Sequence, residues 1–262
     1  MASKKRQKTI GREGPKGGKP LAYERVVTKV SGEACGGVDK NGNSKLGLDH
    51  KAIARIAEDI KKAHDEGVEI AVVPGGGNFV RGKETAKRGV DRAQADTMGM
   101  LGTVINGLAL QDALEKLGCV VRVMSAVDIP SAVEPYIRRR AMRHLEKGRI
   151  VIFVGGIGAP FFSTDSTVVQ RAVEIGADLA IAAKNGVDGV YTGDPKTDKS
   201  ARKLNRVSLS KALRKDYKVM DSTAFAQALA QDLTILVIDG NKPGELIKAL
   251  RKKKGVGTIV HP

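Results

Sequence analysis

The sequence is poor in aromatic residues, which make up 3% of its 262 residues and include no Trp. A buried core must therefore be built mainly from Val, Ile, Leu and Ala. The buried strands of a parallel sheet typically read as short runs of such aliphatic residues. The shortage of aromatics thus favours a parallel sheet covered by helices, and it argues against an aromatic surface on which nucleic-acid bases stack.

Cysteine and long hydrophobic runs are scarce as well. Cys35 and Cys119 stand far apart, and their spacing matches neither a disulfide framework nor a zinc site, which fits a reducing cytoplasm. No run approaches the roughly 20 apolar residues that a membrane-spanning helix needs, and the basic N-terminus lacks the apolar segment of a signal peptide. We therefore expect a cytoplasmic protein that is neither secreted nor membrane-spanning.

Basic residues are abundant, and the formal net charge is +16. Residues 1–25 hold eight Lys or Arg against two Glu, so this segment contributes +6 and the remainder of the chain +10. The first 20 or so residues are rich in Gly, Lys and Pro and have no hydrophobic period. We therefore expect residues 1–22 to form a basic, disordered arm with possible non-specific nucleic-acid contact, and residues 23–262 to form one domain.

From Tyr23 onward, aliphatic runs alternate with amphipathic stretches. The predicted strands are residues 26–30, 69–73, 120–124, 149–154, 179–182, 187–191 and 233–237. The predicted helices follow Asp49, cover about 94–117, run from Pro135 to about 147, and lie near 208–214, 223–230 and 244–253. This order predicts an α/β fold: a single three-layer domain with a mainly parallel sheet between helices.

Small-residue loops follow four of these strands, at residues 31–33, 75–78, 155–158 and 192–195. In an open α/β sheet, ligands bind beyond the carboxyl ends of the strands, where glycine lets backbone N–H groups approach phosphate oxygens. Neither a Walker-type loop nor a dinucleotide fingerprint is present, so phosphate must be held in another way. Lys29, just before the first loop, and Arg81, just after the second, are candidate phosphate ligands.

Several ordered motifs make the pattern more specific. They are Lys29-Val30-Ser31-Gly32-Glu33, the glycine loop 75–82, the helix 95–107, the segment 134–149, the loop 160–165, residues 187–195 and Val219-Met220-Asp221. Taken together, over about residues 23–260, they resemble the bacterial uridylate kinases of the amino acid kinase superfamily. The resemblance implies the amino acid kinase fold and transfer of the γ-phosphate of ATP to UMP.

The resemblance also implies the roles of individual residues. Lys29 contacts the β- and γ-phosphates, and Asp165 orients Lys29 by charge pairing; these two are the expected catalytic residues. No general base is needed, because the UMP phosphate already carries an attacking oxygen. Mg²⁺ enters with ATP and is held largely by phosphate oxygens and water, so no protein metal site is expected.

Two sets of ligand-binding residues follow from the same resemblance. The expected ATP-binding residues are Lys29, Val30, Ser31, Gly32, Gly77, Arg81, Asn185, Tyr191 and Asp194. The expected UMP-binding residues are Gly76, Asp96, Ile157, Gly158, Ala159, Pro160, Phe161, Phe162, Ser163 and Thr164. The chain departs from its relatives in two places: residues 156–160 read Gly-Ile-Gly-Ala-Pro instead of Gly-Thr-Gly-Asn-Pro, and Asn185-Gly186 follows Lys184 where some relatives have Lys-x-Thr.

Other interpretations stay open at this point. The chain could be an inactive or regulatory relative that binds nucleotides or nucleic acid, or a kinase of another small acidic metabolite. Asp96 could be an ordinary helix residue, Asp165 and Asp221 could be helix N-caps, and residues 138–140 fit a solvated face or an interface better than a substrate site. The resemblance further implies a homo-oligomer, in relatives a hexamer.

Overall fold

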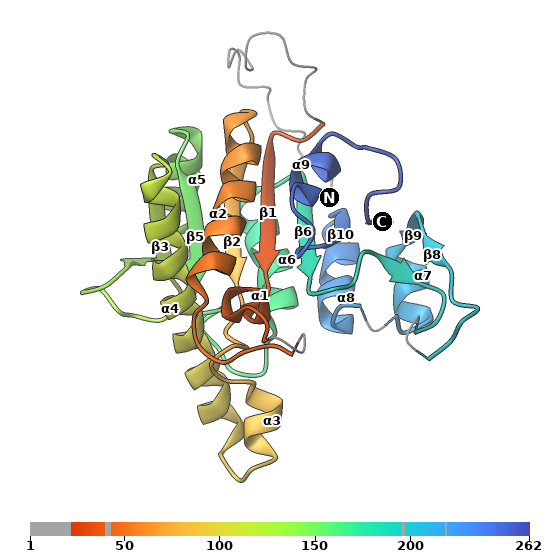
Figure 1. Ribbon diagram of the computed structural model, residues 1–262, viewed down its shortest axis with the longest axis horizontal. Coiled ribbons are helices and arrows are strands. Elements are labelled where there is room, and N and C mark those ends of the chain that lie inside the picture. The colour runs from red at the N-terminus through yellow and green to blue at the C-terminus, as the bar shows by residue number, and fades with distance from the viewer. Residues whose placement is uncertain (1–21, 40–42, 195–196, 218) are drawn as a thin grey trace.

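The structure, a computed structural model shown in Figure 1, describes residues 22–39, 43–194, 197–217 and 219–262. Apart from Ala22, the predicted basic arm lies outside the described residues. Among the helices of the described stretches, none is both long and apolar enough to cross a membrane.

The strands are short and mostly aliphatic. They are β1 (Arg25–Val30), β2 (Glu69–Pro74), β3 (Val121–Ser125), β4 (Glu134–Pro135), β5 (Ile150–Val154), β6 (Leu179–Lys184), β7 (Val190–Tyr191), β8 (Lys203–Leu204), β9 (Arg206–Ser208), β10 (Ile235–Asp239) and β11 (Thr258–His261). In the described part of the chain, nine of them form one sheet in the order β4-β3-β5-β2-β1-β6-β10-β11-β9, while β7 and β8 pair separately. Neighbours in the large sheet are parallel except for β10 and β11.

Helices connect the strands. They are α1 (Gly32–Gly36), α2 (His50–Asp65), α3 (Gly82–Ala86), α4 (Arg92–Lys116), α5 (Arg138–Glu146), α6 (Thr164–Ile175), α7 (Leu209–Arg214), α8 (Ser222–Ala230) and α9 (Glu245–Leu250). The helix α2 illustrates why they form. Its N-cap Asp49 accepts a hydrogen bond from the backbone N–H of Ala52 at 2.9 Å, and Ile53, Ile56 and Ile60 bury one face.

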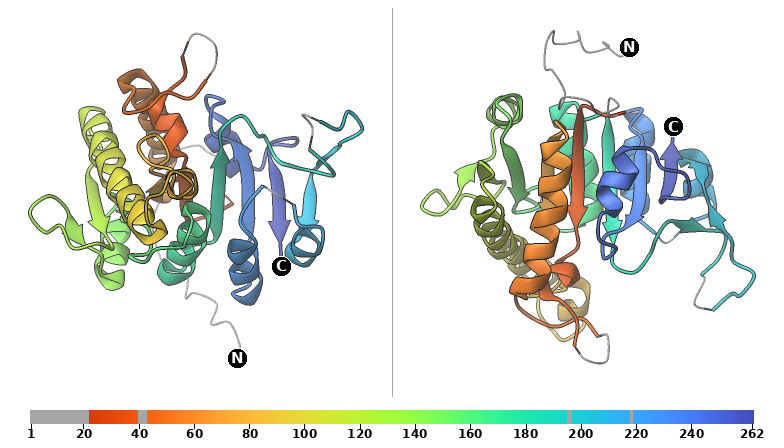
Figure 2. Two further views of the ribbon diagram at one scale, coloured as in Figure 1. Left: turned by 90° about the horizontal axis from the view of Figure 1, so that it is seen from below. Right: turned by 45° about the horizontal axis from the view of Figure 1, so that its top comes forward.

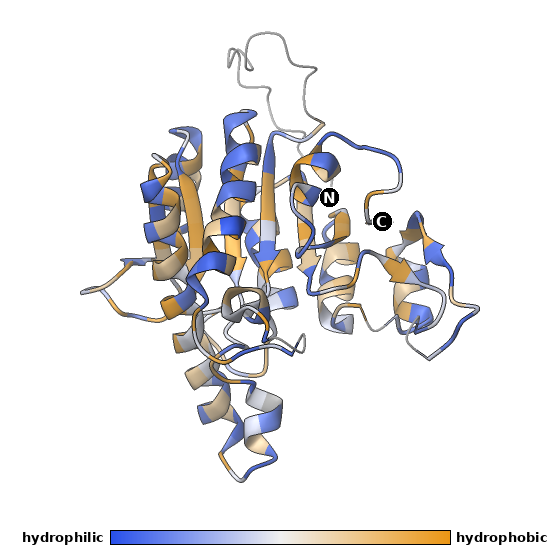
Figure 3. Cartoon of the chain, viewed as in Figure 1, coloured by the Kyte–Doolittle hydropathy of each residue, from blue (hydrophilic) through white to orange (hydrophobic). Residues whose placement is uncertain are grey.

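The helices cover both faces of the sheet, as Figure 2 shows. Buried side chains of α2, α4 and α9 form one core with the sheet, and those of α5, α6, α7 and α8 form a second core. In the central strand β1, Val26 belongs to the first core and Val27 to the second. Figure 3 shows the resulting pattern of hydrophobic strands between helices with hydrophilic outer sides. The predicted α/β architecture, a mainly parallel sheet between two helical layers, is confirmed.

Several predicted boundaries are wrong. Pro135 does not begin a helix: it belongs to the edge strand β4, where a residue without an N–H is tolerated, and α5 begins at Arg138. The predicted strand 187–191 is reduced to Val190–Tyr191 and lies in the small sheet. The predicted strand 233–237 is displaced by two residues, since β10 begins at Ile235.

Candidate active site

The carboxyl ends of β1 and β2 bring two of the glycine loops into contact. The two strands are parallel and in register, with Val30 opposite Pro74. Beyond them, a Cβ atom added to Gly32 would lie only 2.4 Å from the backbone nitrogen of Gly77, so a side chain at residue 32 would prevent this approach. The loops that follow β1 and β2 therefore meet at one edge of the sheet, as the sequence predicts.

Three charged side chains form an ion cluster beside these loops. Lys29 of β1 lies with its Nζ 2.8 Å from Oδ1 of Asp165, in the first turn of α6. Lys184, at the end of β6, lies with its Nζ 3.0 Å from Oδ1 and 2.8 Å from Oδ2 of the same carboxylate. Sequence reasoning paired Lys29 with Asp165 and missed Lys184, although a lysine directly after the aliphatic run 179–183 was a signal for it.

The cluster is shielded from water, and this shifts two pKa values. The side chains of Lys29, Asp165 and Lys184 are 13%, 10% and 15% exposed. Burial alone would raise the pKa of Asp165, but the charges of Lys29 and Lys184 hold that pKa below its ordinary value. Burial and the neighbouring Lys29 lower the pKa of Lys184 to about 8, against the opposing effect of Asp165. Asp165 is therefore an anion shared by two ammonium groups.

The first turn of α6 explains how Asp165 reaches the lysines. Ser163, not Asp165, is the N-cap, and its side chain accepts a hydrogen bond from the N–H of Ser166 at 3.3 Å. Asp165 is thus free of capping and faces the sheet, where it is buried. The alternative that Asp165 is only an N-cap is wrong. Asp221 does occupy the N-cap position of α8, but its side chain makes no capping hydrogen bond.

A cavity of about 400 Å³ opens next to the start of α6. Six of the expected acceptor residues line this cavity, which we call the acceptor cavity: Gly76, Asp96, Ala159, Phe162, Ser163 and Thr164. Gly77 and Arg81, expected at the ATP phosphates, also line it. Residues on its wall that sequence reasoning did not assign include Arg92, Met100, Thr103, Gly156 and Asp221.

Asp96 is more than an ordinary helix residue. Its carboxylate accepts two hydrogen bonds from Nε of Arg92, both at 3.0 Å, and one from the backbone N–H of Phe161 at 2.8 Å. The guanidinium of Arg92 in turn lies 5.6 Å from the centre of the Phe161 ring. Asp96 therefore ties α4 to the loop 155–162, in addition to facing the acceptor cavity.

The other expected acceptor residues lie elsewhere on the loop 155–162. Ile157 lines a second cavity of about 460 Å³, which Phe162 shares with the acceptor cavity. Gly158 and Phe161 have positive φ angles of +86° and +71°, and the Phe161 side chain is exposed. Gly158 and Pro160 shape the loop without lining either of these two cavities.

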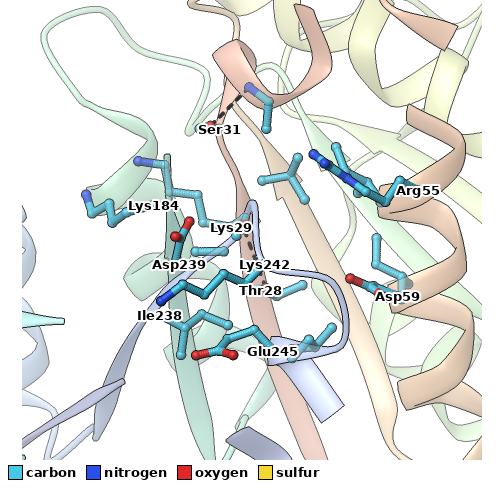
Figure 4. Close-up of a pocket in the computed structure, with 17 residues that line it drawn as sticks. Thr28, Lys29, Ser31, Arg55, Asp59, Lys184, Ile238, Asp239, Lys242 and Glu245 are labelled. Carbon is cyan, nitrogen blue, oxygen red and sulfur yellow. Dashed lines mark hydrogen bonds between the residues drawn. The ribbon is translucent and has the colours of Figure 1, made fainter. Parts of the chain in front are cut away.

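Apart from Gly32, Gly77 and Arg81, whose positions are given above, the expected ATP-binding residues fall into two groups. Val30 and Ser31 line a cavity of about 50 Å³ together with Lys29 and Lys184 (Figure 4). Ser31 is also the N-cap of α1 and accepts a hydrogen bond from the N–H of Ala34. The second group does not line this cavity. Asn185 accepts a hydrogen bond from Asn241, and Tyr191 donates one to Asp188 at 2.7 Å. Asp194 follows the strand β7 in the chain.

Arg81 has two acidic partners. It contacts Glu33 at 2.9 Å and Glu84 at 3.1 Å, which holds its guanidinium at the acceptor cavity.

The described side chains do not form a metal site of their own. In the described stretches, no three His, Cys, Asp or Glu side chains are grouped to hold a metal ion, and both oxygens of Asp165 are engaged by lysines.

Known proteins with similar sequences and structures share this architecture. The chain is 50% identical over 236 residues to a uridylate kinase of Clavibacter michiganensis, with 90% of this chain and 96% of that protein covered. The crystal structure of UMP kinase from Bacillus anthracis is similar with a TM-score of 0.84 and 40% identity, covering 91% of this chain and 96% of that one. UMP kinase from Ureaplasma parvum matches with a TM-score of 0.84 and 36% identity, covering 91% and 99%. The model of the Amino acid kinase family matches residues 24–239, and the chain belongs to this family.

Proposed function

We propose that this protein is a UMP kinase, which transfers the γ-phosphate of ATP to the phosphate of UMP and releases UDP and ADP. The observation that carries the proposal is the double role of the first turn of α6. Ser163 and Thr164 line the acceptor cavity, and the next residue, Asp165, pairs with Lys29 and Lys184. An acceptor in the cavity is thereby brought next to two buried cations. Identity of 50% to a protein named uridylate kinase supports the same conclusion.

The reaction needs positioning and charge stabilisation more than covalent chemistry. As the γ-phosphoryl group leaves ADP, negative charge spreads over its oxygens and onto the leaving oxygen. Lys29 and Lys184 supply two ammonium groups there, and Asp165 fixes their positions. Because the acceptor phosphate of UMP is already ionised at neutral pH, its oxygen attacks phosphorus without a general base.

The substrates occupy opposite sides of this ion cluster. UMP binds in the acceptor cavity against Gly76, Asp96 and the loop 155–162. Magnesium-bound ATP, as the donor substrate, places its phosphates near Lys29, Ser31 and Gly32 and its nucleoside toward Asn185, Tyr191 and Asp194. Gly77 and Arg81 line the acceptor cavity, and we expect them to lie where the phosphates of ATP meet the single phosphate of UMP.

We also propose that the chain self-associates, as a hexamer by resemblance. Support comes from one face of α4, where Met98, Leu101, Ile105 and Leu108 are 45%, 44%, 44% and 36% exposed. Their spacing puts the four side chains on one stripe of the helix, and exposed apolar patches of this kind are typical of protein interfaces. Light scattering tests this proposal, because it measures the molar mass of the assembly in solution. Ile105→Lys is expected to reduce that molar mass. If Ile105→Lys leaves a hexamer intact, the stripe is not an interface.

We also propose roles for the N-terminal segment and the domain that follows it, and a cellular location for the enzyme. We expect residues 23–262 to form the catalytic domain, and the basic residues 1–22 to attract nucleic acid through their charge without completing the site. We expect the enzyme to act in the cytoplasm, where both of its nucleotide substrates are found.

The proposed function is tested by measuring ADP formation from ATP with a panel of acceptors. UMP is expected to be the best acceptor, ahead of CMP, dUMP, AMP and small carboxylic acids. A better rate with a carboxylate or carbamate would identify a different kinase of this family. Absence of turnover with every acceptor, from protein that binds ATP, would favour a regulatory relative.

A further inference from the structure

The loop 155–162 forms a thin wall between two cavities. The acceptor cavity, of about 400 Å³, is lined by Gly156, Ala159 and Phe162. The second cavity, of about 460 Å³, is lined by Ile157 and again Phe162. The loop packs closely against Ala126: a Cβ atom added to Gly158 would lie only 2.9 Å from the carbonyl oxygen of Ala126. Hydrogen bonds to the neighbouring helices also hold its backbone.

Two of these bonds fix the beginning of the loop from opposite sides. The N–H of Gly155 donates to Oγ1 of Thr103, on α4, at 2.8 Å. Nη2 of Arg171, on α6, donates to the carbonyl oxygen of Gly156 at 3.1 Å. Gly156 has a φ of +60°, which glycine adopts without strain. The backbone at the start of the wall is thus held between α4 and α6.

Arg171 is itself held firmly. Its side chain is 5% exposed, its Nη1 lies 2.6 Å from Oε2 of Glu174, and its guanidinium lies 3.8 Å from the centre of the Tyr136 ring. The hydroxyl of Tyr136 donates to the same carboxylate, which also accepts from Gln170 at 2.6 Å. These contacts restrict the orientation of the planar guanidinium, so the hydrogen bond to Gly156 is directional.

Stability alone does not account for Arg171. Its Nε is buried and has no hydrogen-bond partner among the described residues. Replacing a buried ion pair by well-packed apolar groups is often neutral or stabilising, and an unsatisfied donor adds a further penalty. The directional bond to Gly156 is a function that an apolar side chain of similar length cannot perform.

We propose that Arg171 is a positioning residue, which sets the wall of the acceptor cavity for UMP through its bond to Gly156. The proposal rests on the proposed function for the identity of the acceptor. Arg171 touches none of the reacting groups. Since the wall borders the acceptor cavity and not the small cavity beside Lys29, the effect is confined to the acceptor.

The test compares Arg171→Met with the natural protein. We expect the KM for UMP to rise about ten- to a hundredfold, as is typical for a small misplacement of binding groups, with the KM for ATP unchanged. Arg171→Lys keeps a positive donor and is expected to recover part of the loss. Hydrogen exchange of the backbone at 155–162, measured without substrate, is expected to be faster in Arg171→Met.

Arg25 provides a matched control. Its side chain is 2% exposed, lies 2.6 Å from Glu69 and donates to the carbonyl oxygen of Ile175, the last residue of α6. It stands at the amino end of β1, however, and makes no hydrogen bond to the loop 155–162, all of which the structure describes. Arg25→Met therefore removes an equally buried ion pair, and it is expected to leave both the KM for UMP and exchange in the loop unchanged. Equal effects of Arg25→Met and Arg171→Met would mean general destabilisation and would overturn the proposal.

Three further cases decide the outcome. If Arg171→Met has the same KM for UMP and the same hydrogen exchange at 155–162 as the natural protein, the proposal is also overturned. If Arg171→Met does not fold, Tyr136→Phe is measured instead: a raised KM for UMP alone supports the proposal, and an unchanged one contradicts it. If the natural protein does not phosphorylate UMP but the loop loosens in Arg171→Met, the positioning role stands and the proposed function fails.

Discussion

Lys184 donates to both oxygens of Asp165, at 3.0 Å and 2.8 Å, although Oδ1 of that carboxylate already accepts from Lys29. One carboxylate thus neutralises only one of two ammonium groups, and the buried cluster has a net charge of +1. Such an excess is unfavourable in a protein interior until an anion arrives. The cluster is therefore prepared for a phosphate group.

Lys29→Ala is expected to reduce kcat for UMP phosphorylation by about 10²–10³, the usual loss when one preorganised electrostatic contact is removed. The fold should persist, because Lys184 still neutralises Asp165. Kinetics combined with thermal unfolding provide the measurement. Lys61→Ala, at a half-buried lysine on α2 that pairs with Asp65 away from the site, is the control, and its turnover should match that of the natural protein. Normal turnover of a folded Lys29→Ala protein would remove Lys29 from the mechanism.

Activity should fall in mildly alkaline solution. Lys184 carries its charge below its pKa and loses it above, and that pKa is about 8 in the free protein. Because kcat/KM reports ionisations of the free enzyme, kcat/KM for ATP should decline as the pH rises through about 8. In Lys184→Arg the guanidinium stays charged, so the decline should move to higher pH. The same alkaline decline in natural protein and in Lys184→Arg would assign it to another group.

The departures at residues 157 and 159 are expected to have unequal effects on acceptor choice. Ala159 lines the acceptor cavity, whereas Ile157 lines the neighbouring one. Apolar walls discriminate between similar substrates by only about 1–3 kcal/mol, less than sites that hydrogen-bond their substrate. Ala159→Asn should therefore raise the preference for UMP over CMP and dUMP in kcat/KM, and Ile157→Thr should change it little. The double variant combines Ile157→Thr with Ala159→Asn. If its ratio of kcat/KM for UMP to kcat/KM for CMP equals that of the natural protein, neither residue affects specificity.

Deleting residues 1–20 is expected to leave UMP kinase activity almost unchanged. The deleted segment has no core-forming pattern, but its lysines and arginines attract phosphates in a salt-dependent, sequence-independent way. Binding of the truncated protein to RNA or DNA should therefore be weaker, as measured by fluorescence anisotropy at low and moderate salt. Loss of turnover on truncation would show that the segment contributes to the site.

The parts of the fold predicted correctly are those with a strong local pattern. The apolar stripe of α2 and the aliphatic strands β1, β2 and β5 have clear periods and clear ends. The strand β11 was missed because Thr258–His261 is only four residues long, although Thr258, Ile259 and Val260 are β-branched and favour a strand. Pro135 was misread because its favourable place in a helix and its tolerance at a sheet edge look alike in sequence.

In the candidate site, too, residues in strong sequence motifs were identified from the sequence and residues without such a pattern were missed. Lys29 and Asp165 were paired from motifs 136 residues apart, and the structure brings them to 2.8 Å. Lys184 appears in the sequence patterns only as the first residue of the departure from Lys-x-Thr, and Arg171 belongs to none of the ordered motifs. The importance of both comes from three-dimensional contacts with Asp165 and Gly156. The opposite orientations of Ile157 and Ala159 likewise depend on the turns at Gly156 and Gly158, which a sequence pattern does not specify.

The order of strands at one edge of the sheet has a consequence for how the chain folds. In the described sheet, β9 is joined to the other strands through β11 alone, and β11 is made more than 50 residues after β9. During synthesis, Arg206–Ser208 must therefore wait for residues 258–261 before it has a pairing partner. We expect the edge formed by β9 and α7 to fold last, after the strands that carry Lys29 and Lys184 are in place.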